Sequence, residues 1–183
     1  PHQLHVHQES ENVIIDWDSF NIGSEAWTHF DQQGNAGWKA LNRIEDANPS
    51  QIYGRLTADG QVYLINANGI LFAPGSQVDV HALVASALNI TPDDFLADRM
   101  VFTSSDPAFA ESHGVVANHG DIRAQSGGSI FLVGDAVENS GTVSVDFGQL
   151  ALVGGGEVEI GFTAQSATNY KNILLGDDPG TVL

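Results

Sequence analysis

Short apolar runs separated by tight turns set the pattern in the middle of the chain. The stretch GQVYLINANGILFAPGSQVDV, from Gly60 to Val80, contains apolar runs at 62–65, 70–72 and 78–80. Each run has the length of a strand and is too short for a stable helix. The turn Asn66-Ala67-Asn68-Gly69 starts with a side-chain acceptor and ends with Gly, as a type I turn prefers. The pattern predicts strands joined by tight bends, whose pairing partners lie elsewhere in the chain.

The later part of the chain repeats such a unit. The segment NHGDIRAQSGGSIFLVGDAVE begins at Asn118, and NSGTVSVDFGQLALVGGGEVE begins at Asn139, an offset of 139 − 118 = 21 residues. A period of about 20 with several short strands per unit is typical of solenoids. Leucine-rich repeats have a similar period, but their Leu-x-x-Leu-x-Leu spacing is missing, and propeller blades are about twice as long. A parallel β-helix fits, because each of its coils holds short strands joined by tight turns.

A β-helix also explains why the turns are so short. Each strand pairs with the strands one coil above and one coil below, so a turn only has to bend the chain. Asn118 and Asn139 would lie one coil apart, and we expect their amides to stack in a ladder. The core is expected to contain Ile65, Ile70, Leu132 and Leu152.

Two segments depart from the repeat. In LNITPDDFLADRM, Thr91 suits an N-cap and Pro92 the first helical position, so we predict one short helix near 91–98. The following segment is interpreted as an excursion that rejoins the coil near Val115. At the other end of the chain, Leu4 and Val6 alternate with histidines, as on a half-buried strand.

The chain is expected to divide into five parts of one domain. WKALNRI is interpreted as a strand because a proline turn follows it at once. The five parts are an N-terminal cap and first coil (1–47), coils (48–90), an extra-helical excursion with the short helix (91–114), further coils (115–165), and a tail or start of a next coil (166–183).

Composition narrows the class of protein and of partner. The 183 residues suit one domain with its own core. Lys and Arg total 6 against 23 Asp and Glu, and the net charge of −17 disfavours nucleic acid and anionic membranes as partners. No apolar run approaches the roughly 20 residues that span a bilayer, so no membrane insertion is expected. The absence of Cys excludes disulfides, thiolate catalysis and Cys-ligated zinc.

Five segments, taken in order, resemble one known family. They are VIIDWDSFNIG, NRIEDANPSQIYGRL, GQVYLINANGILF, VDVHALVASALNI and the repeat region from VVANHGDIRA to GQLALVGG. Together they resemble the N-terminal secretion domain, also called the haemagglutination-activity domain, of two-partner secretion exoproteins such as filamentous haemagglutinin. The resemblance covers roughly residues 4–165. It implies an all-β fold, a right-handed parallel β-helix with N-terminal capping strands and extra-helical excursions.

The resemblance also implies a function. Such a domain is the address read by a dedicated outer-membrane barrel transporter, whose periplasmic POTRA domains bind the exoprotein while it is unfolded or extended. The family's Asn-Pro-Asn-Gly turn maps onto Asn66, Ala67, Asn68 and Gly69, followed by Ile70, with Ala in place of Pro. A second family pattern matches Asn48, Pro49 and Ser50. We therefore expect a monomeric, non-enzymatic fragment of a longer exoprotein, which transits the periplasm and is secreted or held at the cell surface without a cofactor.

Two other classes of function stay open. A flat β-helix face can bind glycan or protein, as an adhesin does, with receptors on host or bacterial surfaces as partners of the full-length protein. β-Helices also carry polysaccharide-acting enzymes, which need paired carboxylates on one face. Same-face pairs that follow from the period of two are Asp16 with Asp18, Glu157 with Glu159, and Asp79 with His81. The basic residues are scattered, which argues against a clamp for an anionic sugar: Lys39, Arg43, Arg55, Arg99, Arg123 and Lys171.

No metal site is expected. His5 and His7 share one strand face, but no third ligand is evident near them in the sequence. Asp177 and Asp178 precede Pro179-Gly180 and lack the ligand count of a calcium loop, so a turn is expected there. The aromatic residues of the first 40 positions are expected in core and cap packing rather than in a sugar platform: Trp17, Phe20, Trp27, Phe30 and Trp38.

Overall fold

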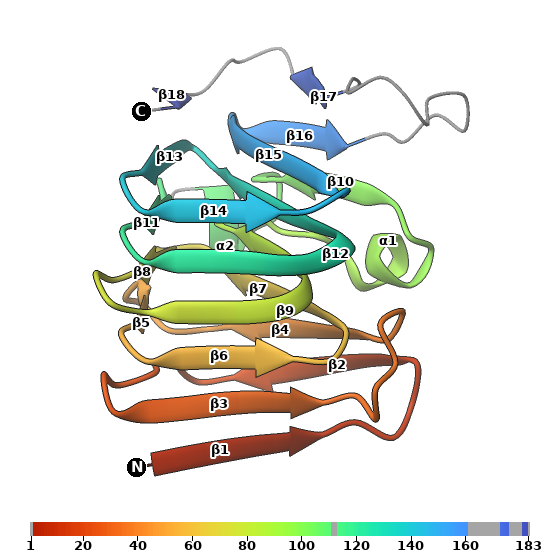
Figure 1. Ribbon diagram of the computed structural model, residues 1–183. Helices are drawn as coiled ribbons and strands as arrows, with labels where there is room; N and C mark the ends of the chain where they lie inside the picture. Colours follow the sequence, from red (N-terminus) through yellow and green to blue (C-terminus); the bar gives the residue numbers. More distant parts are fainter. Residues whose placement is uncertain (1, 111–112, 161–172, 176–180, 183) are drawn as a thin grey trace.

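The chain forms a column of stacked β coils, with the N-terminus at one end (Figure 1). The computed structural model describes residues 2–110, 113–160, 173–175 and 181–182. Asp177, Asp178 and Lys171, considered above, lie outside these residues. Strands that stack from coil to coil pair in parallel, one above the other. The predicted right-handed parallel β-helix is confirmed.

The column has three faces. The first face, turned to the viewer in Figure 1, holds β1 (His2–His7), β3 (Ala26–Asp31), β6 (Arg55–Ala58), the first halves of β9 (Gln77–Ser86) and β12 (Asp121–Gly134), and β14 (Thr142–Val145). The second face holds β2 (Asn12–Trp17), β4 (Lys39–Ile44), β7 (Gln61–Asn66), the second halves of β9 and β12, and β15 (Gln149–Gly154). The third face holds β5 (Ser50–Ile52), β8 (Gly69–Phe72), β11 (Val115–Asn118), β13 (Ala136–Asn139) and β18 (Thr181–Val182). The strand predicted at WKALNRI is confirmed as β4.

The inward side chains of the three faces form an inner core. Alternate residues of a strand point to opposite sides, so each strand contributes every second side chain. Ile70 and Leu132 lie in this core as predicted, and Leu152 is half-buried against it. Leu4, expected to be half-buried, is 43% exposed because β1 pairs with β3 alone among the described strands.

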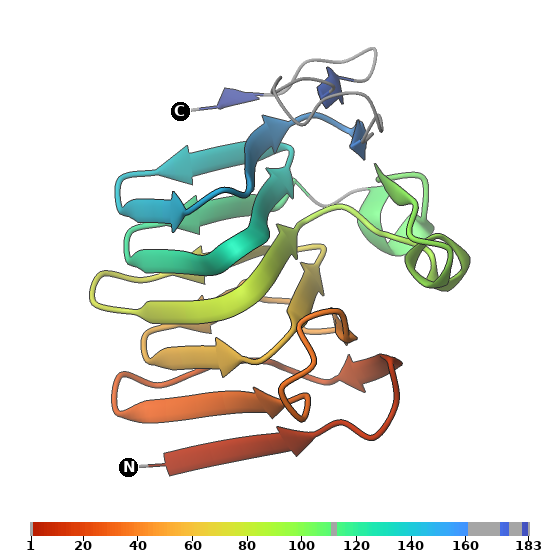
Figure 2. The ribbon, with the colours of Figure 1, turned by 45° about the vertical axis from the view of Figure 1, so that its right-hand side comes forward.

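An excursion leaves the column after β9 and stands beside the second face (Figure 2). Its helix α1 (Pro92–Leu96) confirms the predicted short helix, and the Thr91 hydroxyl accepts a hydrogen bond from the Asp94 N–H at 3.1 Å. A second helix of four residues, α2 (Pro107–Ala110), was not predicted. Within the residues that the structure describes, no helix has both the length and the apolar character to cross a membrane. The chain rejoins the column at Val115, the first residue of β11.

The excursion also forms a small antiparallel sheet. Its strand β10 (Met100–Thr103) pairs with β16 (Glu157–Ile160), and β16 pairs with β17 (Ile173–Leu175). Residues 157–160, predicted to lie in the coils, therefore belong to this extra-helical sheet. A pattern of alternating apolar residues does not distinguish parallel from antiparallel pairing, which is why the sequence could not reveal this.

A second, outer core fills the space between the second face and the excursion. From the second face it receives the outward side chains of Leu41, Tyr63, Ile65, Val84 and Phe131. From the excursion it receives Phe95, Met100 and Phe102. Ile65 was expected in the core and is 1% exposed, but it lies in this outer core and not inside the column. The second face is therefore covered by protein on both sides.

Candidate functional site

The predicted turn residues lie at the corner between β7 and β8. Asn66 is fully buried, and its Oδ1 accepts a hydrogen bond from the Asn68 N–H at 2.9 Å, which closes the turn. Its Nδ2 donates to the carbonyl of Asn48 at 3.1 Å and to the hydroxyl of Ser50 at 3.0 Å. The amide of Asn66 therefore uses its acceptor and both its donors within the protein.

The two motifs singled out in the sequence are thus in direct contact. Asn68 adds a second link, because its Nδ2 donates to the Asp46 carbonyl at 2.9 Å. Ser50 is buried and pairs in register with Ile70, which is also buried. Asn48 and Pro49 remain exposed at the surface of the corner. The contact arises from the stacking of successive coils, since 18 residues separate Asn48 from Asn66.

Gly69 allows the next coil to approach the turn. Its φ of +103° lies in a region that favours glycine, and a Cβ at this position would lie only 2.5 Å from the carbonyl oxygen of Val115. A Cβ at Gly114 would lie 2.4 Å from the carbonyl oxygen of Ala67. The next coil covers the turn so closely that Ala67 is only 7% exposed.

The amides of Asn118 and Asn139 meet one coil apart. These residues pair in register between β11 and β13, and Asn118 Nδ2 donates to Asn139 Oδ1 at 2.8 Å. The buried Asn118 also donates to the Thr142 carbonyl at 3.2 Å and accepts from the Gly120 N–H at 3.1 Å. The Asn118 corner is therefore tied to the coil that follows it.

The carboxylates considered for catalysis occupy outward positions. Asp16 forms an ion pair of 3.4 Å with Arg43 on the neighbouring strand, and Glu157 and Glu159 are exposed on β16. Asp79 and His81 follow one another on the outward side of β9. Outward polar residues at a period of two are what the strand geometry gives on any coil.

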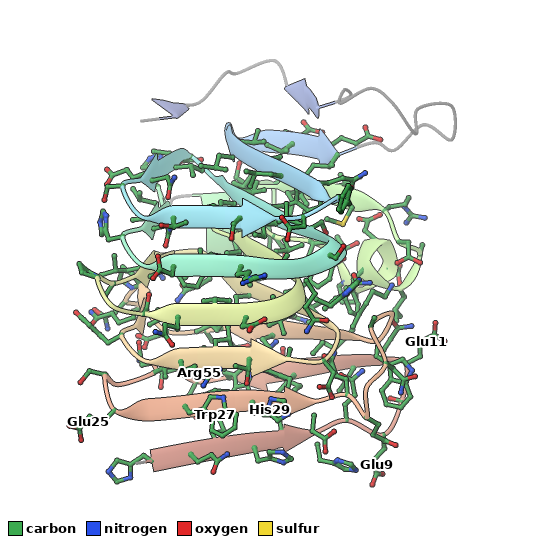
Figure 3. All side chains as sticks on the ribbon, in the orientation of Figure 1. Glu9, Glu11, Glu25, Trp27, His29 and Arg55 are labelled. Atoms are coloured by element: carbon green, nitrogen blue, oxygen red, sulfur yellow. The ribbon has the colours of Figure 1, made fainter. Side chains whose placement is uncertain are left out.

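Of the aromatic residues, Phe20 and Phe30 lie in the inner core, and Trp17 packs against it half-buried. Trp38 is half-buried before β4. Trp27 instead points outward from β3 on the first face, where it is half-buried (Figure 3). The Arg55 guanidinium carbon lies 5.8 Å from the centroid of its ring.

Sequence reasoning missed a buried cation under the excursion. The Lys39 side chain is 7% exposed, and its Nζ donates to the Phe95 carbonyl at 3.3 Å and contacts the Asp98 carboxylate. This contact fastens the end of α1 to β4. Beside it, burial and then the charge of Asp98 raise the pKa of Tyr63. The sequence did contain a signal for the cover over this face, although not for the lysine itself. The unbroken apolar run Val62–Ile65 indicates a strand buried on both sides.

Residues 48–50 and 66–70 together form what we call the corner motif. This motif stabilises the stack of coils and offers no reactive group. Its hydrogen bonds fix the register of adjacent coils, and its side chains are largely withdrawn from the surface. In the folded protein, the accessible part of the two motifs consists of Asn48, Pro49 and part of Asn68. Any partner that reads the remaining side chains must do so before the coils stack.

Comparison with known proteins gives the motif its context. The family model of the TPS secretion domain matches residues 2–181. Two heme/hemopexin-binding proteins of Haemophilus influenzae are 39% and 38% identical to this chain over 88 residues, which are 48% of the chain. These matches span only 9% and 10% of the relatives' own lengths.

A solved structure agrees with the same family. The secretion domain of HMW1 from Haemophilus influenzae superimposes with a TM-score of 0.78 at 29% sequence identity. The superposition covers 92% of this chain and 43% of that chain. The matched family model describes a secretion domain and not an enzyme. The chain belongs to the family of TPS secretion domains, which direct two-partner secretion exoproteins through a cognate outer-membrane transporter to the cell surface or the medium.

Proposed function

We propose that the cognate transporter reads the corner motif through its periplasmic POTRA domains before the coils form. Burial of the motif carries this proposal, because Asn66 is fully buried and Ile70 is 1% exposed in the folded domain. A partner that contacts these side chains needs the chain unfolded or extended. The corner motif then serves twice, first as a recognition element and later as a lock between coils.

Recognition and folding exclude each other in this mechanism. Short apolar segments such as 62–65 and 70–72 can add as strands to an exposed sheet edge of a POTRA domain. The same segments form β7 and β8 once the chain folds outside the cell, and each coil is a template for the next. Folding thus removes the recognition element from its partner, which biases export outward without ATP.

Binding to the isolated POTRA domains tests the proposal. Leu132→Asp places a charge in the inner core and supplies a chain that cannot complete its coils. We expect the POTRA domains to bind this variant and to bind folded wild type at least tenfold more weakly. Adding Asn66→Ala and Asn68→Ala to the unfolded variant should abolish the binding, because these changes remove the side chains that the POTRA domains read. Since the Leu132→Asp chain is already unfolded, such a loss cannot result from a loss of folding.

A second pair of corner asparagines provides the matched control. Asn118→Ala with Asn139→Ala, in the same Leu132→Asp background, removes two asparagines from another Asn-x-Gly corner and should leave POTRA binding intact. The proposal would be contradicted if the POTRA domains bound folded wild type as tightly as the Leu132→Asp variant. It would also be contradicted if both pairs of asparagine substitutions reduced POTRA binding equally. Export of residues 1–183 fused to a signal peptide, with and without the transporter, separately tests the targeting role.

A further inference from the structure

Three histidines and an aspartate gather on the outer side of the first face. The strands β1 and β3 pair in parallel, with His5 opposite His29 and His7 opposite Asp31. Val6 and Phe30 pack toward the inner core, so these four residues share the opposite, outward side. The sequence showed His5 and His7 without a third ligand. Pairing with β3 supplies one from 24 residues along the chain.

Thr57 holds His29 in an orientation suited to metal binding. Trp27 Nε1 donates to the Thr57 hydroxyl at 2.6 Å, and His29 Nδ1 lies 2.8 Å from the same oxygen. An indole N–H can only donate, so the Thr57 hydroxyl accepts from Trp27, and its second lone pair can accept from His29 in the Nδ1–H tautomer, the tautomer that coordination through Nε2 requires. This arrangement leaves Nε2 of His29 free to coordinate. Figure 3 shows Trp27 and His29 side by side on β3.

Asp31 orients the His7 ring in the way that Thr57 orients His29. His7 Nδ1 lies 2.9 Å from Asp31 Oδ2, and the other carboxylate oxygen accepts from the Gln33 N–H at 3.0 Å. A carboxylate on one ring nitrogen of a histidine is the usual outer partner of a metal-ligating imidazole. The His7 ring therefore also presents Nε2. His5 is exposed, with its ring centroid 5.2 Å from that of His29.

We infer that His5, His7 and His29 form a binding site for a first-row transition-metal dication of the Zn²⁺ type. At their backbones His5 and His29 are about 5 Å apart, His5 and His7 about 6–7 Å, and the diagonal pair His7 and His29 about 8 Å. Three Nε2 atoms can bridge these spacings through one ion. Imidazole nitrogen suits Zn²⁺, Cu²⁺ and Ni²⁺ rather than Ca²⁺ or Mg²⁺. A water molecule completes four-coordination.

The rings must turn to bind. Among the described residues, no group of three or more His, Cys, Asp or Glu side chains is arranged to hold an ion as it stands. His5 is exposed and can change rotamer without disturbing the core, and the His7 side chain, 51% exposed, can pivot about its Nδ1 contact with Asp31 and keep Nε2 available. An ion held by β1 and β3 together binds only the folded pair, and it therefore stabilises the first coil.

Zn²⁺ titration of residues 1–183 by calorimetry, with Co²⁺ absorption as a second readout, tests the site. We expect one ion per chain, a visible spectrum of four-coordinate Co²⁺, and a thermal midpoint that rises with Zn²⁺. His5→Gln and His29→Gln should each weaken Zn²⁺ binding at least 100-fold. Thr57→Val should weaken it by about 10-fold or more, because it removes the group that orients His29.

His113→Gln is the matched control. His113 Nδ1 also lies near a carboxylate, at 2.6 Å from Asp135 Oδ2, but it is outside the β1–β3 cluster. Its substitution should leave Zn²⁺ binding unchanged. No one-to-one binding by wild type, unchanged binding in His29→Gln, or an equal loss in His113→Gln would overturn the inference. Circular dichroism of each variant shows whether the coils are retained.

Discussion

The two halves of strand β9 face different surroundings. In the first half, on the first face, Gln77 and Asp79 are exposed, whereas Val78 and Val80 are buried. In the second half, 82–86, every residue is buried, because the inner core lies on one side of the second face and the outer core on the other. One strand therefore follows a period of two where solvent covers one side, and is buried throughout where protein covers both.

This difference indicates how the two cores depend on each other. Most strands of the inner core pair with the adjacent coil about 20 to 30 residues away, and only the coils on either side of the excursion pair over a longer separation, as Val78 does with Ile122 (122 − 78 = 44 residues). The outer core joins Lys39 to Asp98, 59 residues later, and pairs Val101 with Glu159. Contacts between distant residues cost more loop-closure entropy and form more slowly. We expect the outer core to form after the coils and to open before them.

Breaking the inner core should have the largest effect. Leu132→Asp puts a charge at a fully buried position, and we expect it to cost more than about 5 kcal/mol, comparable with the whole stability of a domain of this size. Circular dichroism and urea denaturation measure the loss of the coils. Leu96→Asp, at a position on α1 that is 53% exposed, makes the same chemical change and should cost less than about 1 kcal/mol. Similar losses at both positions would contradict the assignment of the inner core.

Disrupting the outer core should leave the coils folded. Phe102 is fully buried under the excursion, and Phe102→Ala should reduce the free energy of unfolding by about 3–5 kcal/mol. Amide hydrogen exchange should then show loss of protection in β10 and β16, while β9 and β12 stay protected. Uniform loss of protection across all strands would mean that the two cores form a single cooperative unit.

Much of the column could be predicted from the sequence. The period between Asn118 and Asn139 gave the coil length, and the cap at Thr91 gave the start of α1, because both depend on neighbours in the chain or on a regular repeat. The stacking of Asn118 on Asn139 follows from the same repeat. These features needed no knowledge of where distant segments dock.

The rest depends on docking between distant segments. The sequence placed Asn48 and Asn66 in separate motifs, and only the register between β5 and β8 brings them together. His29 could not be assigned to His5 without the register of β1 on β3. The apolar run Val62–Ile65 did signal an outer cover, but the identity of the covering segment is fixed by shape and packing, which a period does not encode.

The contact of Lys39 with Asp98 ties the excursion to an early coil. Variants at these two residues therefore test how strongly the excursion is attached to the coils. Asp98→Asn removes the charge that partners a buried cation, and we expect a loss of about 1–3 kcal/mol. Asn is the suitable replacement because Asp98 has a φ of +57°, which Asn tolerates. Lys39→Met removes the cation and keeps most of the volume, so it should cost less, about 1 kcal/mol. Urea denaturation of both variants decides the order, and a greater loss in Lys39→Met would show that the charge pair itself stabilises the excursion.

The smallest effect concerns pH at the exposed end of α1. A hydrogen bond from Thr91, and then one from Arg99, hold the pKa of Asp94 below its usual value of 3.8. A carboxylate with a lowered pKa stabilises the folded state at a pH above the unfolded pKa, and this contribution is lost as the pH falls through the folded pKa. Asp94→Asn should therefore lower the thermal midpoint at about pH 7, and this effect should shrink as the pH falls through the lowered folded pKa of Asp94. Asp93→Asn, at an exposed position on the same turn, should shift the midpoint little at about pH 7 or in acid. An Asp94→Asn effect that persists unchanged in acid would assign the contribution of Asp94 to hydrogen-bond geometry and not to its charge.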